Sequence, residues 1–135
     1  MTAEEIALEI SKYPSRHLVI TGGEPSIQLD SDLLRAIKAY RFYVQIETNG
    51  TNPVPVEVDW VTCSPKEAPW KVDRIDELKI VYQGQDVEEI AKLLPATHHF
   101  LQPVSGINID ETVRYCLENP TWRLSLQTHK LIDIQ

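Results

Sequence analysis

The stretch His17-Leu18-Val19-Ile20-Thr21-Gly22-Gly23-Glu24-Pro25 joins a short apolar run to a pair of glycines. The apolar run predicts a buried strand, and Gly22-Gly23 predicts the loop that ends it. Residues 2–12 ahead of it have the pattern of a helix, which Pro14 stops. Asp30 or Ser31 can cap the next helix. This part of the chain therefore predicts the order helix, strand, loop, helix.

The same alternation of elements continues to the end of the chain. We expect further strands at 42–47, 58–62, 78–82, 99–102 and 122–126, and helices at 30–40, 86–94 and 109–117. Strands that alternate with helices form a parallel sheet with helical crossovers. No repeat, low-complexity tract or linker interrupts the pattern, so residues 1–135 are predicted to form a single α/β domain.

The predicted strands carry one polar and one apolar face. Tyr43, Gln45 and Glu47 share one face, and Val44 and Ile46 share the other. The strands near 77–82 and 122–127 alternate in the same way. A flavodoxin-like sheet is covered by helices on both faces and should be apolar on both, whereas a barrel with a wet interior has a polar inner face. This favours an incomplete (β/α) barrel of mainly parallel strands.

The composition excludes several classes of partner. The 135 residues suit one modest core, and no run approaches the ~20 apolar residues of a membrane-spanning helix. The 20 acidic and 13 basic residues give a net charge of −7, which argues against nucleic acid as a partner. The first residues are acidic and lack the features of a signal peptide. We expect a cytoplasmic protein without a membrane partner.

The two cysteines, Cys63 and Cys116, lie far apart in different predicted elements. They cannot form a CxxC pair or a zinc ligand set, and we predict no metal site in this chain. We expect both thiols to be reduced and structural, because nothing else in the sequence suggests an oxidising compartment.

The candidate binding residues follow the predicted strands. Parallel α/β folds bind ligands at the carboxyl ends of their strands. The unusual residues at those ends are Thr21, Gly22, Gly23 and Glu24; Glu47 and Asn49; Ser64, Pro65 and Lys66; Gln102 and Pro103; and Gln127 and His129.

Gly22-Gly23 lets a ligand approach main-chain groups directly, because these residues have no Cβ. Pro25 biases Glu24 toward an extended conformation, so carbonyls and a carboxylate together suit an ammonium group. The simpler alternative is a turn with an exposed glutamate. A GxGxxG fingerprint is absent. Asn49 before Gly50 is also a common turn pair, and Lys66 taken alone is compatible with a solvated side chain.

Taken in order, these segments resemble a known family. The TGGEP segment at Thr21–Pro25 resembles the GGE motif of radical S-adenosylmethionine (SAM) enzymes. The succession TGGEP, ETNGT, SPK, ELKIVY, LQP and RLSLQTHK is similar to 7-carboxy-7-deazaguanine synthases of the queuosine pathway. The similarity extends from Thr21 to Lys130, and its most specific part is the closing QTHK segment.

The resemblance implies a radical ring contraction of 6-carboxy-5,6,7,8-tetrahydropterin that uses SAM, a [4Fe-4S] cluster and Mg²⁺. It implies a homodimer, and it assigns no catalytic residue. Thr21, Gln127 and His129 would contact the pterin. The SAM site would comprise Gly22, Gly23 and Glu24 at the methionine end, Glu47 and Asn49 at the ribose, and Ser64, Pro65, Lys66, Gln102 and Pro103.

The printed sequence departs from the family in one respect. Family members bind the cluster through three closely spaced cysteines, which precede the helix that leads to TGGEP. That cysteine loop, the first strand and the Mg²⁺-binding threonine are not found here, so we expect a truncated chain that is inactive alone. Two alternatives stay open: a non-catalytic relative that binds SAM or pterin, and a generic α/β interaction domain.

Overall fold

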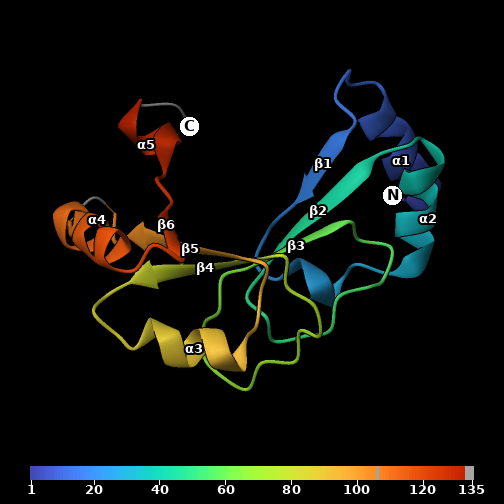
Figure 1. Cartoon of the computed structure of the whole chain (residues 1–135). Helices are drawn as coiled ribbons and strands as arrows, with labels where there is room; N and C mark the ends of the chain where they lie inside the picture. The colour runs from blue at the N-terminus through green and yellow to red at the C-terminus, as the bar shows by residue number, and fades with distance from the viewer. Residues whose placement is uncertain (106, 133–135) are drawn as a thin grey trace. The chain divides into compact units, whose positions relative to one another are not determined.

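Three parallel strands and two α-helices form the first of two units in the computed structural model, which describes residues 1–105 and 107–132. This unit is Met1–Ile75 and the second is Asp76–Gln135. In chain order, the elements of the first unit are α1 (Ala3–Ser11), β1 (His17–Ile20), the short 3₁₀ helix η1 (Pro25–Ile27), α2 (Ser31–Ala39), β2 (Tyr43–Thr48) and β3 (Trp60–Cys63) (Figure 1).

Strand β2 lies between β1 and β3, and both pairs are parallel. The register pairs His17 with Tyr43 and Ile20 with Ile46 on one side of β2. On the other side, Thr48 pairs with Cys63. The carboxyl ends of β2 and β3 therefore meet at one edge, as the sequence predicted for strands joined by crossovers.

Local sequence explains where the two helices of this unit begin. The Thr2 hydroxyl accepts a hydrogen bond from the Glu5 amide at 3.2 Å, and the Glu5 carboxylate accepts one from the Thr2 amide at 2.7 Å. This reciprocal capping box satisfies two amides that the helix itself leaves unpaired. Asp30 caps α2 by accepting from the Leu33 amide at 2.8 Å. Both predicted helix starts are confirmed.

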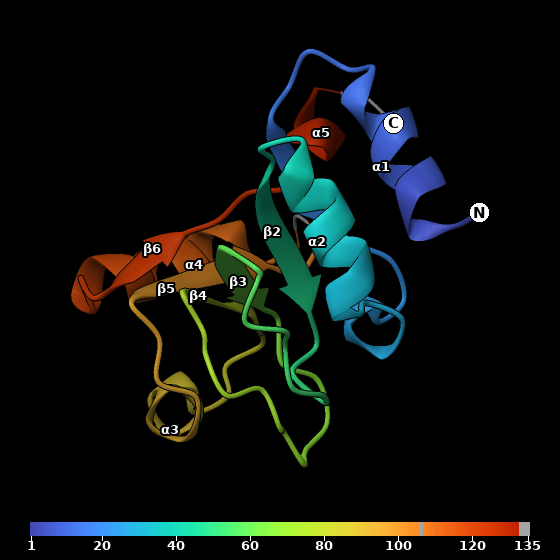
Figure 2. The same ribbon diagram turned by 90° about the vertical axis from the view of Figure 1, so that its right-hand side faces the viewer.

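The core of the first unit lies between its strands and its two helices. Figure 2 shows α1 and α2 side by side on the same side of β2. The buried side chains come from α1, α2, β2 and β3 and include Ala7, Leu34, Ile37, Val44, Ile46 and Val61. Each buried Leu, Ile or Val contributes roughly 1.5–3 kcal/mol relative to an exposed position. Burial of this one face fixes which side of β2 is polar.

The second unit repeats the arrangement with different residues. Its elements are β4 (Glu77–Tyr82), α3 (Val87–Leu93), β5 (His98–Pro103), α4 (Ile109–Glu118), β6 (Trp122–Leu124) and α5 (Thr128–Leu131). Strand β5 lies between β4 and β6, again in parallel. The Ser125 amide extends the β5–β6 ladder by donating to the Leu101 carbonyl at 2.8 Å.

Aromatic side chains hold the helices of the second unit against its strands. Trp122 is 3 % exposed, and its indole N–H donates to the Glu88 carboxylate on α3 at 2.6 Å. The His99 ring meets the Trp122 ring edge-on at 5.1 Å between centroids. Tyr82 on β4 and Tyr115 on α4 lie 5.0 Å apart by the same measure. Such pairs add to the apolar burial.

Three local predictions were wrong. The apolar face expected for residues 109–117 included Leu117, which is 78 % exposed, whereas Thr112 is fully buried there. Thr112 tolerates burial because its hydroxyl donates to the Asn108 carbonyl at 2.9 Å. Tyr40, expected on the buried face of α2, is the C-cap and is 40 % exposed. The last strand ends at Leu124 rather than at residue 126, and the following QTHK segment contains α5.

The predicted α/β class with parallel strands is confirmed. The alternation predicted for β2 is confirmed as well, because Val44, Ile46 and Thr48 are buried while Tyr43 is exposed. Across the described ranges, no helix has the length and apolar character needed to cross a membrane.

Candidate functional site

The carboxylate of Glu24 joins two loops of the first unit. It accepts hydrogen bonds from the Thr48 hydroxyl and from the Asn49 amide, each at 2.7 Å. Within its own loop it accepts from the Ser26 amide at 3.1 Å and also from the Ser26 hydroxyl. Four donors therefore converge on one carboxylate, and they tie the loop after β1 to the end of β2.

This environment keeps Glu24 ionised. Partial burial acts to raise the pKa of the carboxyl group, but hydrogen bonds from Ser26, Asn49 and Thr48 outweigh burial and lower the pKa below its ordinary value. Hydrogen bonds from neutral donors favour the charged form of a carboxyl group. The loop therefore carries a fixed negative charge at neutral pH.

The Asn49-Gly50 turn is built into the core of the first unit. The Asn49 side-chain oxygen accepts from the amide and the hydroxyl of Thr51, at 2.9 and 2.7 Å. Gly50 has a φ of +84° and is buried, and its carbonyl accepts from the Lys71 and Val72 amides at 2.8 and 3.1 Å. The turn reading of this pair is confirmed, and the turn anchors the segment that follows β3.

The glycine pair at 22–23 stands beside open space. Gly22 has a φ of +141°, a conformation that favours glycine, and a Cβ placed on either Gly22 or Gly23 would meet no atom within 4 Å. The main chain here is exposed next to the anchored Glu24. A ligand can therefore approach this backbone directly, which fits the ammonium end of an amino acid moiety.

The SPK segment follows β3 at the same end of the strands. The Ser64 amide donates to the Thr48 carbonyl at 2.8 Å, so the segment starts beside the end of β2. Ser64 and Pro65 are half-buried, and Lys66 is exposed. The Lys66 carbonyl accepts from the Trp70 indole at 3.1 Å. Thr21 directly follows β1 and is exposed as well.

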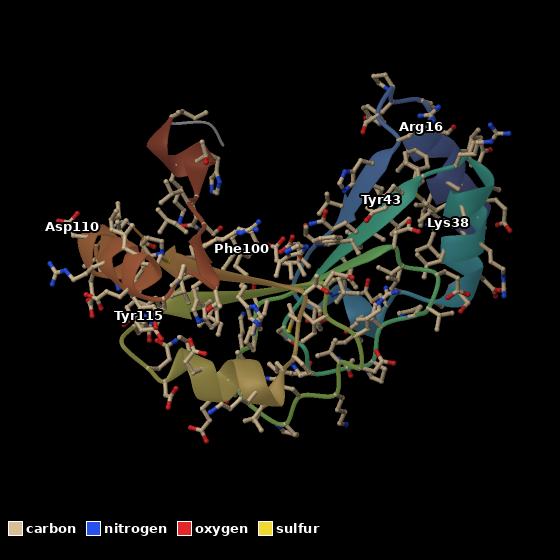
Figure 3. The ribbon with its side chains drawn as sticks, viewed as in Figure 1. Arg16, Lys38, Tyr43, Phe100, Asp110 and Tyr115 are labelled. Carbon is tan, nitrogen blue, oxygen red and sulfur yellow. The ribbon has the colours of Figure 1, made fainter. Side chains whose placement is uncertain are left out.

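The face of the first unit opposite its helices carries a hydrogen-bonded polar row. The Gln45 side chain donates to the Glu47 carboxylate at 3.1 Å and to the Thr62 hydroxyl at 3.3 Å, and its oxygen lies 3.0 Å from the His17 ring. Figure 3 shows Tyr43 on the side of β2 away from Lys38 of α2. Glu47, predicted at the ribose, lies in this row.

In the second unit, the predicted residues lie at the end of β5 and in the segment after β6. Gln102 is half-buried and Pro103 is buried. Gln127 is half-buried at the N-cap of α5, and His129 is exposed within that helix. Phe100 lies on the side of the strands away from α3 (Figure 3). Gln102 follows it by two residues in β5, so the two share a face.

Sequence reasoning missed Thr48 and Ser26, the two hydroxyl residues that hold Glu24. Thr48 is 4 % exposed and sits directly between Glu47 and Asn49, both of which were predicted. The available signal was its place at the end of an alternating strand, where its side chain turns inward. A buried hydroxyl there requires a partner.

The cysteines do not fit an iron–sulfur cluster. Cys63 is fully buried, and burial, with the nearby charge of Glu24, raises the pKa of its thiol to about 12. A buried neutral thiol is a poor metal ligand, because metals bind the thiolate. Cys116 lies in the second unit, and burial raises the pKa of its thiol too. Among residues 1–105 and 107–132, no three metal-ligating side chains gather.

No family model matches the chain. The 7-carboxy-7-deazaguanine synthase of Bacteroides thetaiotaomicron is 53 % identical over 136 residues, covering 100 % of this chain and 74 % of that protein. The Bordetella pertussis protein of the same name is 48 % identical, covering 98 % of this chain and 66 % of the relative.

A solved structure agrees. The crystal structure of QueE from Escherichia coli matches with a TM-score of 0.78 and 32 % identity, over 94 % of this chain and 64 % of that one. The chain therefore spans somewhat less than two thirds of the QueE chain.

The parallel strands, with exposed residues in the loops at their carboxyl ends, define an α/β protein. The sequence comparisons narrow this class. The chain belongs to the 7-carboxy-7-deazaguanine synthase family.

Proposed function

We propose that this chain forms the SAM- and pterin-binding part of a 7-carboxy-7-deazaguanine synthase. The reaction is the radical ring contraction of 6-carboxy-5,6,7,8-tetrahydropterin in queuosine biosynthesis. One observation carries the proposal: the open backbone at Gly22-Gly23 lies next to an ionised Glu24 that accepts four hydrogen bonds from within the protein. The family relationship supports the same reading.

In the first unit, the exposed main chain of Gly22 and Gly23 would hold the amino acid end of SAM. Glu47 and Asn49 would reach the ribose hydroxyls. The side-chain oxygen of Asn49 accepts from Thr51, so the side-chain nitrogen of Asn49 is the group that would donate to the ribose. The SPK segment, Ser64, Pro65 and Lys66, would line the site further along.

In the second unit, Gln102 and Pro103 are the residues proposed to bind SAM. Gln127 and His129 of this unit are proposed as pterin-contacting residues, and Thr21 is the residue of the first unit proposed for that role. Amide and imidazole groups suit the ring nitrogens and carbonyl of a pterin, because they can donate and accept hydrogen bonds. None of these residues is assigned as an acid or base.

Bound together with a [4Fe-4S] cluster, SAM supplies a 5′-deoxyadenosyl radical. Cys63 and Cys116 do not fit such a cluster. We propose that this chain does not carry out the reaction alone, and that it binds SAM weakly. The family's Mg²⁺ has no candidate ligand set among the described residues. The proposed setting is cytoplasmic, with a homodimer and without nucleic acid.

Calorimetric titration of the chain with SAM and with 6-carboxypterin tests this proposal. We expect weak, saturable binding of SAM, which Gly23→Val and Lys66→Ala weaken further. Lys92→Ala, which removes another exposed lysine from α3, is the matched control and should bind like the unchanged chain. Tight SAM binding that neither site variant affects would contradict the proposed site. Absence of binding to both compounds would favour a generic interaction domain.

A further inference from the structure

Thr48 is almost completely buried, and its hydroxyl bonds to two different loops. Its side chain is buried, with the whole residue 4 % exposed. Its hydroxyl donates to Glu24 at 2.7 Å and accepts from the Gly50 amide at 3.1 Å. One buried oxygen thus contacts both the loop that follows β1 and the turn that follows β2.

The Glu24 carboxylate is engaged from inside the protein on both of its oxygens. An ionised carboxylate offers about four acceptor positions. Here Oε1 receives the Thr48 hydroxyl and both donors of Ser26, while Oε2 receives the Asn49 amide. A ligand ammonium group at Oε1 would compete with three internal donors, and at Oε2 it would share the oxygen with the Asn49 amide. The arrangement is that of a clamp, in which Glu24 shapes its loop instead of reaching out of it.

We infer that Glu24 and Thr48 form a positioning pair, which sets the distance between the Gly22-Gly23 backbone and Asn49. The inference rests on the proposed SAM site, whose methionine end and ribose end these two segments would hold. The backbone of the glycine pair then binds the ligand, and Glu24 acts through that backbone. This gives Glu24 a role other than direct contact with the SAM amino group.

The inference predicts that a substitution at Thr48, which is buried, changes the affinity for SAM. Thr48→Val keeps the shape of the side chain and removes both hydrogen bonds of its hydroxyl. The Glu24 carboxylate then loses one of its two hydrogen bonds to the end of β2, so the loop after β1 is less ordered. Ordering that loop on binding reduces the affinity for the ligand. We expect SAM affinity to fall by roughly tenfold, the range of one charge-assisted hydrogen bond.

Nuclear magnetic resonance titrations with SAM can measure this in the weak-binding range. The unchanged chain is compared with Thr48→Val, with Thr48→Ser, which restores the hydroxyl, and with Thr112→Val. Thr112 is a matched control, since it is fully buried and its hydroxyl donates to a carbonyl in the second unit. We expect Thr48→Ser and Thr112→Val to remain within about twofold of the unchanged affinity.

A second signal reports on the clamp without any ligand. The Asn49 amide proton is bonded to Glu24, so its chemical shift should move as the carboxylate is protonated in acid. In Thr48→Val the midpoint of that change should move to higher pH, since one stabilising donor is gone. If Thr48→Val does not fold, Ser26→Ala removes a different donor from the same carboxylate and is read in the same way.

The outcomes separate this inference from the function on which it rests. An unchanged chain that binds no SAM would remove the proposed function and the inference with it. SAM binding that Thr48→Val leaves intact, while Glu24→Gln abolishes it, would overturn the inference alone and make Glu24 a direct ligand. An equal loss of affinity in Thr112→Val would also overturn it, because the effect would then be one of general stability.

Discussion

A Cβ atom placed on Gly50 would lie 3.0 Å from the Sγ atom of Cys63, which is tighter than most Cβ contacts in real proteins. The glycine also has a φ of +84°, in the left-handed region. The turn after β2 is therefore set against the end of β3 by the absence of a side chain.

Gly50→Ala should destabilise the chain by about 2–4 kcal/mol, since backbone strain adds to overpacking against Cys63. Denaturant-induced unfolding measures the change. Gly23→Ala is the matched control, because a Cβ there meets no atom within 4 Å, and it should change stability by less than about 0.5 kcal/mol. Similar losses in both variants would contradict the packing argument.

The two thiols should differ in reactivity. Burial and the Glu24 charge raise the pKa of Cys63 to about 12, so almost no thiolate exists at pH 8. Cys116 is only partly buried. We expect one thiol to react with a disulfide reagent in the native chain and both to react after unfolding. Peptide mapping that finds Cys63 modified first would contradict this.

Acid should destabilise the first unit through two carboxylates. Burial acts to raise the pKa of Asp59, but hydrogen bonds from Lys38 and the Val44 amide lower it, and the pKa of Glu24 is lowered as well. A carboxyl group whose pKa is lowered by folding stabilises the fold at pH values above its unfolded pKa of ~4. That stabilisation is lost as the pH falls through the lower pKa of the folded state. The thermal unfolding temperature should thus be nearly constant around neutral pH and should fall below about pH 4.

The double variant Glu24→Gln, Asp59→Asn tests the origin of this acid sensitivity. Its stability at pH 7 should be lower than that of the unchanged chain, and its decline in acid should be shallower. An undiminished decline would assign the effect to other groups.

Replacing Glu88 should lower the free energy of unfolding more than replacing its neighbour Glu89. Glu88→Ala leaves the indole N–H of the buried Trp122 without its acceptor, and a lost partner of this kind costs about 1–3 kcal/mol. Glu89→Ala removes the same charge from the first turn of α3 and controls for the helix dipole. Chemical unfolding followed by tryptophan fluorescence compares the two. Equal losses would mean that the indole bond contributes nothing.

Strand β1 should mediate assembly of the proposed homodimer. It pairs with β2 and ends the strand order, and an apolar groove of about 330 Å³ beside it is lined by residues that include Ile6, Ile10 and Leu18. Val19 in this strand is 46 % exposed, and an apolar strand edge favours pairing with another chain. Light scattering should show that Val19→Lys shifts the chain toward monomer, whereas Leu117→Lys on α4 does not. A monomeric unchanged chain would contradict the prediction.

Sequence alone determined the features that depend on near neighbours in the chain. The alternation along residues 43–48 separated Gln45 and Glu47 from Val44 and Ile46, because side chains alternate across any strand. Asp30, predicted with Ser31 as a possible cap, marked a helix start because capping involves residues only three apart. The ordered segments from TGGEP to QTHK indicated the family, which the relatives then confirmed.

Only the tertiary structure decided the features that join distant segments. Glu24 and Thr48 are 24 residues apart, and no local pattern pairs them; folding brings the loop after β1 to the end of β2. Thr112 rather than Leu117 is buried because the position of α4 against its strands, and not residue type alone, selects the covered face. Charge and thiol acidity at Glu24 and Cys63 follow from burial and from donors that only the fold assembles.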